Sequence, residues 1–145
     1  MLEIFAGTGG VSACFKRHGF TNTVAVDKTR HVGSLVSVVP MDLTRLEDQQ
    51  AVLAWIRHPA VRAVFLAPPC GTSSAARNIE IPGELAPRPL RSIEQPDGLD
   101  TLQGVDLARV SAANVLYAFA AEILCDATSM ESFLCWKTPE TAFSG

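Results

Sequence analysis

The sequence predicts an α/β domain built on a largely parallel, Rossmann-like open sheet of about five strands with flanking helices. Short apolar runs alternate along the chain with segments whose apolar residues recur every three or four positions. The 145 residues contain 48% hydrophobic and 19% charged residues, which is typical of a folded globular protein. Such a chain is long enough for one domain with a substantial core, and we therefore expect residues 1–145 to form a single domain.

The predicted elements follow one another as strand, helix and strand. Strands are expected at 2–5, 23–26, 36–39, 63–66 and 133–136, and helices at 11–18, 45–58 and 105–124. Gly19 is placed to cap the first helix, and Pro59 ends the second. Residues 79–104 hold many prolines and glycines without a clear period, so we expect a long irregular loop there.

Composition and charge exclude several classes of protein. No apolar run approaches the roughly 20 residues that span a bilayer, so we expect a soluble, intracellular protein that binds no membrane. The net charge of −3 disfavours a chain that grips duplex DNA by itself. Four cysteines without a paired spacing predict neither a disulfide framework nor a metal site. Cys14, Cys125 and Cys135 are interpreted as small buried hydrophobic residues.

The polar residues that follow the first three predicted strands suggest a nucleoside site. Gly7, Gly9 and Gly10 form a turn whose backbone N–H groups a ligand could approach. Asp27 ends the second strand, where an acid can accept hydrogen bonds from ribose hydroxyls, and Asp42 follows the third. The glycine spacing differs from the dinucleotide and triphosphate motifs, which disfavours those ligands. A plainer interpretation is a tight turn with acids that cap strands or helices.

A cysteine turn follows the fourth predicted strand, with the sequence Ala67-Pro68-Pro69-Cys70-Gly71-Thr72-Ser73-Ser74. The prolines restrict the backbone, and the small residues leave room for a flat ligand. A thiol near the start of a helix is favoured as the thiolate. The alternative is an inert turn with a buried cysteine.

Three of these segments together resemble the C5-cytosine DNA methyltransferases. Phe5-Ala6-Gly7-Thr8-Gly9-Gly10 is similar to the family's cofactor motif, Met41-Asp42-Leu43-Thr44 to its adenine-contacting motif, and Pro69-Cys70 to the pair that carries its nucleophile. The resemblance implies that Cys70 adds to carbon 6 of a cytosine flipped out of DNA, and that a methyl group then passes to carbon 5. It also implies that S-adenosyl-L-methionine is held by Phe5, Ala6, Gly7, Thr8, Gly9, Gly10, Asp27, Lys28, Asp42, Leu43 and Pro68.

Two departures from the family pattern leave alternatives open. Lys137 stands where the family has a glutamate that assists at ring N3, and a cation cannot replace that carboxylate. The family's later strands and target-recognition region do not follow, so the strand at 133–136 would expose an edge for self-association or a second chain. The alternatives are a truncated or degenerate non-catalytic S-adenosylmethionine-binding domain, or a class I methyltransferase for another acceptor.

Overall fold

The computed structural model describes residues 1–79, 88–129 and 133–136. The chain divides into two compact units. The first unit comprises Met1–Pro68 and Leu116–Lys137, and the second comprises Pro69–Val115 and Thr138–Gly145. The predicted cofactor residues therefore lie in the first unit and Cys70 in the second.

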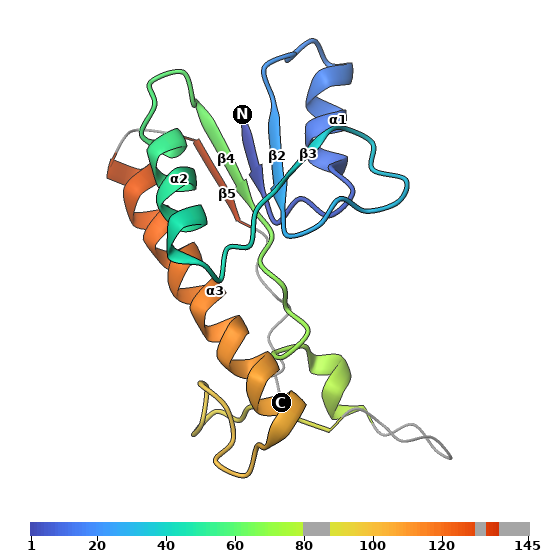
Figure 1. Cartoon of the computed structure of the whole chain (residues 1–145), viewed down its shortest axis with the longest axis vertical. Helices are drawn as coiled ribbons and strands as arrows, with labels where there is room; N and C mark the ends of the chain where they lie inside the picture. The colour runs from blue at the N-terminus through green and yellow to red at the C-terminus, as the bar shows by residue number, and fades with distance from the viewer. Residues whose placement is uncertain (80–87, 130–132, 137–145) are drawn as a thin grey trace. The chain divides into compact units, whose positions relative to one another are not determined.

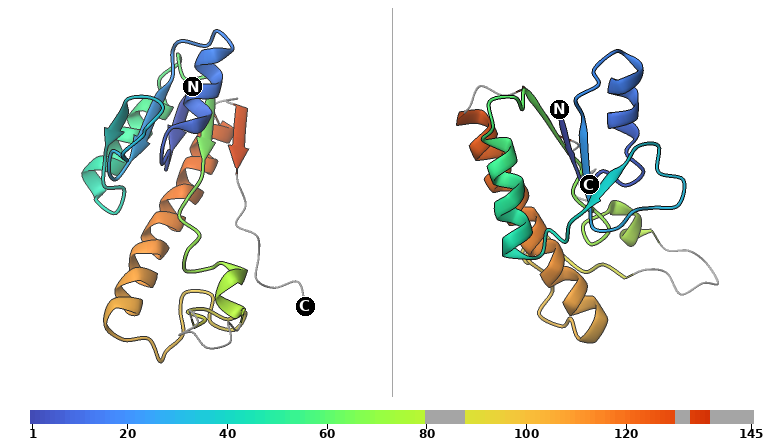
Figure 2. Two further views of the ribbon diagram at one scale, coloured as in Figure 1. Left: turned by 90° about the vertical axis from the view of Figure 1, so that its right-hand side faces the viewer. Right: turned by 45° about the horizontal axis from the view of Figure 1, so that its top comes forward.

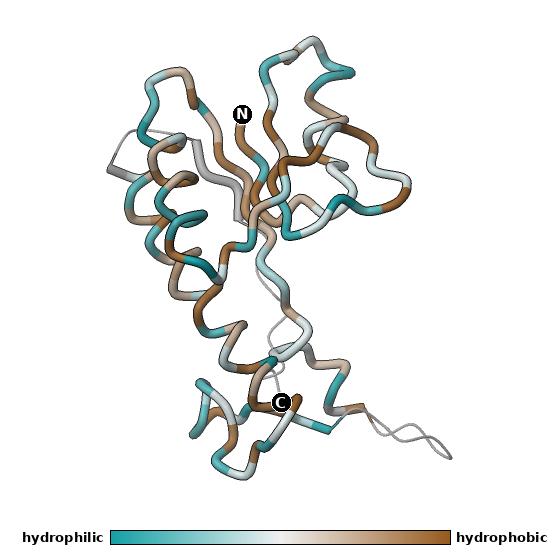
Figure 3. Tube along the Cα trace, in the orientation of Figure 1, coloured by the Kyte–Doolittle hydropathy of each residue, from teal (hydrophilic) through white to brown (hydrophobic). Residues whose placement is uncertain are grey.

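A parallel sheet forms the centre of the first unit, which confirms the predicted α/β class (Figure 1). Its strands run in the order β3-β2-β1-β4-β5, and every neighbouring pair is parallel. The strand bounds are Leu2–Ile4 for β1, Val24–Asp27 for β2, Val38–Pro40 for β3, Ala63–Leu66 for β4 and Phe133–Trp136 for β5. β1, β2 and β4 are hydrophobic over most of their length, as Figure 3 shows. Short apolar strands of this kind suit a sheet that is covered on both faces.

Helices pack on the two faces of this sheet. α1 spans Gly10–Arg17, α2 spans Leu46–Ile56, and α3 spans Gly104–Ser129, with its part from Leu116 onward in the first unit. α2 and the first-unit part of α3 lie side by side in Figure 1 and in the right-hand view of Figure 2. Their apolar residues share one core with the strands, formed by Leu2, Ile4, Val26, Leu43, Val52, Leu53, Ile56, Val64, Leu66, Phe119, Ile123 and Ala127.

The alternation of side chains along β1 places a buried acid, Glu3, on the other face of the sheet. Leu2 and Ile4 of β1 point into the core shared with α2 and α3, so Glu3 between them points to the opposite face. Glu3 is only 3% exposed, and its carboxylate oxygens accept hydrogen bonds from the Val11 and Ser12 N–H groups at 3.2 and 2.7 Å, which offset the cost of burying it. A strand residue thus fixes the start of α1 on that face.

Most element ends differ from the prediction by one or two residues. For the start of β3 and the end of α3, the reason lies outside the local sequence. β3 begins at Val38 and not at Val36, since Val36 packs on Gly9. α3 continues to Ser129 and not only to residue 124. Its last turns are held by Ala127, which is fully buried, and by an ion pair from Asp126 to Arg57 at 2.7 Å.

The second unit has a small core of its own. Leu90, Leu102 and Val110 are buried together, and Leu99 packs against them. Gly98 belongs to this core because a Cβ there would lie 2.7 Å from Val110 Cγ1. Residues 88–103 form no helix or strand, and a short 3₁₀ helix, η1, spans Ala75–Asn78. Residues 80–87 of the predicted loop lie outside the described residues.

One feature of α3 concerns the expectation that the chain binds no membrane. By length and composition alone, Gly104–Thr128 of α3 is apolar enough to cross a membrane, as core helices can also be. In the first unit, Phe119, Ala120 and Ile123 of this helix are buried.

The burial predicted for Cys14 and Cys125 is wrong: both are exposed, because they lie on helix faces turned away from the sheet. Cys135 lies in β5, and its side chain is outside the described set.

Candidate functional site

The glycine turn after β1 has an unusual backbone. Phe5, Gly7 and Gly9 have positive φ angles of 61°, 55° and 76°, and Phe5 is a bulky residue that rarely adopts this conformation. The turn is closed by a hydrogen bond from Gly9 N–H to the Ala6 carbonyl at 2.8 Å, and Ala6 N–H donates to Val26 O at 2.9 Å. Such backbone strain is often found where a protein binds a ligand.

The three glycines of the turn have different surroundings. A Cβ on Gly9 would lie 2.3 Å from Val36 Cγ2, so the side of Gly9 that lacks a Cβ is filled by this chain. Gly7 and Gly10 have no other atom within 4 Å of that position. The Thr8 carbonyl accepts a hydrogen bond from Leu35 N–H at 2.7 Å, while the threonine itself is exposed. Ligand access to the turn is therefore open at Gly7 and Gly10 and closed at Gly9.

Asp27 lies at the end of β2, directly beside this turn. Its Oδ2 accepts a hydrogen bond from Gly7 N–H at 2.7 Å, and its Oδ1 lies 3.7 Å from His31 Nε2. Its side chain is 18% exposed. The acid thus holds the glycine turn against the neighbouring strand and keeps an oxygen available to another donor.

Asp42 follows β3 and forms a second polar centre at the same edge of the sheet. Its Oδ1 accepts hydrogen bonds from the Thr44 hydroxyl at 2.7 Å and the Thr44 N–H at 3.2 Å. Its Oδ2 pairs with Lys28 Nζ at 2.9 Å. Lys28 first, and Thr44 second, lower the pKa of Asp42 to about 2. The carboxyl group is therefore ionised at neutral pH, and Lys28 is its exposed partner.

The remaining predicted cofactor residues are less accessible. Leu43 is buried in the core, and Phe5 packs against that core. Pro68 is buried after β4, where Ala67 N–H donates to Ile4 O at 3.2 Å. Their side chains position the turn and the strand ends, so a ligand would meet mainly the glycine backbone and the two acids.

Glu3 is a site residue that sequence reasoning missed. It fixes the first turn of α1, and the glycine turn leads directly into that helix. Two features of the sequence could have revealed it. Glu3 is an acid at the centre of an otherwise apolar strand, and the helix that follows the glycine turn has no side chain to cap its start.

Cys70 belongs to the second unit and is exposed, which excludes the alternative of a buried thiol. Its carbonyl accepts a hydrogen bond from Ser73 N–H at 2.9 Å, which closes the cysteine turn. Arg77 Nε donates to Gly71 O at 2.5 Å, and Arg91 donates to the Thr72 hydroxyl at 3.1 and 3.3 Å. The helix after the turn is the 3₁₀ segment η1, which has only four residues, so the expected dipole effect on the thiol is small. Lys137 lies outside the described residues.

An open pocket of about 620 Å³ lies at the opposite edge of the sheet, near the amino ends of β1 and β2. Trp55, His58 and Val61 contribute to its walls. This pocket is separate from the glycine turn and from both acids, so it offers a clear contrast when ligand binding is mapped.

No protein-family model, curated protein or solved structure matches this chain. The fold and the polar residues define an α/β domain with a parallel sheet and a candidate site at the carboxyl ends of its strands.

Proposed function

We propose that the first unit binds S-adenosyl-L-methionine and that the chain is a methyltransferase-like domain of the DNA cytosine-5 type. One observation carries this proposal. The glycine turn, Asp27 and Asp42 follow β1, β2 and β3, which are neighbours in a parallel sheet. The strand order reverses at β1, since β2 lies on one side of it and β4 on the other. Ligands of open α/β sheets bind at such a point.

The residues at this edge fit the proposed cofactor. The open backbone at Gly7 and Gly10 would lie against its methionine part, Asp27 would accept from the ribose, and Asp42 from the adenine amine. Asp42 Oδ2 has a second lone pair for that contact, so Lys28 can stay beside it. When bound, S-adenosyl-L-methionine supplies an electrophilic methyl group.

Cys70 has the proposed role of nucleophile toward the target base. Its thiolate would add to carbon 6 of cytosine, and the electron pair of the carbon 5–carbon 6 double bond would make carbon 5 nucleophilic. After transfer, loss of the carbon 5 proton would expel the thiolate and restore the double bond. The exposure of Cys70 supports this role because an attacking sulfur must be reachable.

A non-catalytic S-adenosylmethionine-binding domain is the second candidate, and the observation in its favour is Lys137. A lysine cannot accept a hydrogen bond from the exocyclic amine of cytosine as the family's glutamate does. We therefore propose that cofactor binding is retained and that turnover by this chain is slow or absent.

Calorimetric titration with S-adenosylmethionine and its demethylated product tests the proposal. Asp27→Ala should weaken binding by about 1.5–3 kcal/mol, the range for hydrogen bonds to a charged group. Asp126→Ala is the matched control, because it removes another paired acid of the first unit that lies on α3. Absence of binding by the unaltered chain, or an equal loss in the control, would overturn the cofactor assignment.

A further inference from the structure

Two pockets adjoin at the amino edge of the sheet, within the first unit. The larger pocket, of about 620 Å³, is the one beside Trp55, and a smaller pocket of about 400 Å³ lies next to it. Met1, Thr21, Asn22 and Ala60 line both pockets, so the two share a wall. Ligand pockets of proteins commonly occupy about 300–1,000 Å³, so this edge has room for a small organic molecule.

The walls of the two pockets offer accessible aromatic rings. Trp55 is half-buried in the larger pocket, where Leu2, Val24 and Val61 also line the wall. In the smaller pocket Phe20 is 61% exposed. Aromatic rings attract one another beyond the effect of the area that they bury, so an aromatic ligand gains more here than an aliphatic one of the same size.

Two hydrogen-bond donors come from the turn that joins α2 to β4. His58 lines the larger pocket and Arg62 the smaller one, and Ala60 between them lies in the shared wall. His58 Nδ1 accepts a hydrogen bond from Ala60 N–H at 3.1 Å, so the neutral ring carries its proton on Nε2 and can donate it. The guanidinium of Arg62 supplies further donors and a positive charge.

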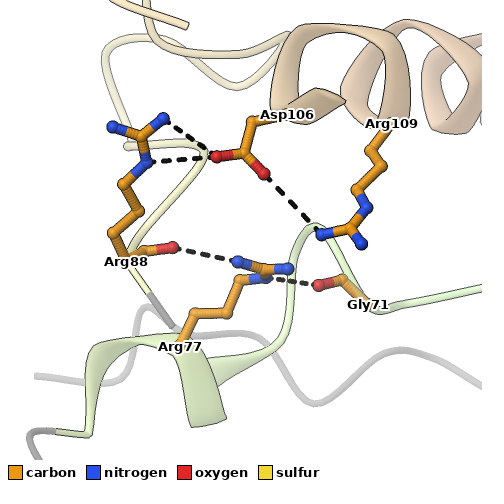
Figure 4. Close-up of polar contacts among 5 residues, drawn as sticks. All are labelled: Gly71, Arg77, Arg88, Asp106 and Arg109. Atoms are coloured by element: carbon orange, nitrogen blue, oxygen red, sulfur yellow. Dashed lines mark hydrogen bonds and ion pairs between the residues drawn. The ribbon is translucent and has the colours of Figure 1, made fainter. Parts of the chain in front are cut away.

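Arg62 differs from the arginines of the second unit, whose guanidinium groups already have partners. Figure 4 shows Arg88 and Arg109 directed toward Asp106, and Arg77 directed toward backbone carbonyl groups. Arg62 is exposed, and among the described residues its side chain has no ion pair or hydrogen bond. Its donors are therefore available to a ligand at the amino edge.

The charge at this edge favours an anion. No acidic residue lines either pocket, although the chain holds 15 acids against 12 lysines and arginines. A carboxylate beside Arg62 would gain a cation and would meet no like charge from the walls. The planar guanidinium also matches a carboxylate, because it can donate two parallel hydrogen bonds to the two oxygens.

We propose that the amino edge of the sheet binds a small aromatic carboxylate. The ring of this ligand lies in the larger pocket against Trp55, and its carboxylate lies at the turn between α2 and β4, where Arg62 and His58 Nε2 donate to it. The glycine turn and the two acids lie at the other edge of the sheet, so this site is independent of the one proposed for S-adenosylmethionine.

An NMR titration of the ¹⁵N-labelled full chain with 2-naphthoate tests the proposal. The amide signals of Val24, Trp55 and Val61 should shift as the ligand is added. Arg62→Gln should weaken binding by at least about fivefold, as expected for the loss of a hydrogen bond between charged groups at an exposed position. The matched control is Arg17→Gln, which removes the same charge from an exposed position that lines neither pocket and should leave the affinity unchanged.

The uncharged probe 2-naphthamide separates the contribution of charge from that of the apolar walls. It should bind the unaltered chain at least about fivefold more weakly than 2-naphthoate, and Arg62→Gln should not change its affinity. Ala54→Leu adds apolar volume to the larger pocket and should weaken both probes. Its control, Gln50→Leu, lies at an exposed position of α2 outside the pocket and should weaken neither.

Four results would overturn the proposal: no shifts at Trp55 with 2-naphthoate, equal affinities for the two probes, an unchanged affinity in Arg62→Gln, or an equal loss in Arg17→Gln. S-adenosylmethionine at saturation should leave the affinity for 2-naphthoate unchanged, and competition between them would contradict a separate site. Binding of 2-naphthoate by a chain that does not bind S-adenosylmethionine would leave this inference standing and remove the proposed function.

Discussion

Gly9 and Gly10 are adjacent in sequence, yet alanine should affect them in opposite ways. Gly9 has a φ of 76°, which costs a residue with a side chain about 1–2 kcal/mol. Its Cβ would also lie 2.3 Å from Val36 Cγ2, and overpacking of this kind typically costs about 1–3 kcal/mol. Gly9→Ala should therefore lower the free energy of unfolding by about 2–5 kcal/mol, measured by urea denaturation.

The contribution of Val36 can be separated by a double-mutant cycle. In a Val36→Ala background the clash is relieved but the backbone strain stays, so Gly9→Ala should cost about 1–3 kcal/mol less than in the unaltered chain. A cost of Gly9→Ala below about 0.5 kcal/mol, or no coupling between the two positions, would refute the reasoning about this packing.

Gly10→Ala tests whether S-adenosylmethionine binds over the glycine turn. Gly10 begins α1 with no atom near its Cβ position, so alanine there should be neutral or stabilising by up to about 1 kcal/mol. The new methyl group fills the open side of the turn, so S-adenosylmethionine should bind at least about tenfold more weakly, which is about 1.4 kcal/mol. Undiminished affinity in this folded variant would show that no ligand lies over the turn.

Three further predictions concern other residues. Glu3→Gln should lower the free energy of unfolding by about 2–3 kcal/mol in urea, because an amide cannot accept from both N–H groups at the start of α1; a loss under about 0.5 kcal/mol would remove Glu3 as an anchor. The pKa of Asp42 is depressed to about 2. Its ionised form therefore contributes to the free energy of unfolding above its ordinary pKa, and this contribution is lost as the pH falls through 2. Asp42→Asn should thus lower the free energy of unfolding by about 1 kcal/mol at pH 7, after allowance for the exposure of Lys28, and by nothing well below pH 2; a loss that does not change with pH would contradict this. DNA that contains 5-fluorocytosine should trap little or no adduct on Cys70, and a clear adduct that Cys70→Ser abolishes would show an active methyltransferase.

The order and type of the elements could be predicted from the sequence because each depends on local patterns. Apolar runs mark the strands at 24–27 and 63–66, and Pro59 limits α2. The boundary of β3 could not be predicted, since Val36 is apolar in either place and leaves the strand to pack on Gly9. The extension of α3 depends on Asp126 and its partner Arg57, which is distant in sequence.

The candidate site was predictable in its position but not in its contacts. Parallel strands bring the residues after each strand to one edge, so Asp27 and Asp42 were expected near the glycine turn. That Lys28 pairs with Asp42 follows from side-chain geometry, which a sequence pattern does not specify. The division into two units, with Cys70 in the second, depends on where the small core around Leu90 forms.

The measurement that tests the central claim most directly is an amide chemical-shift map of the ¹⁵N-labelled chain during titration with S-adenosylmethionine. The account predicts the largest changes at Gly7, Gly10 and Lys28, at the carboxyl edge of the sheet. The pocket at the opposite edge provides the internal comparison, and signals from Trp55 and His58 should stay in place. Changes confined to Trp55 and His58, or no changes at saturating ligand, would contradict the claim that the glycine turn and the two acids bind this cofactor.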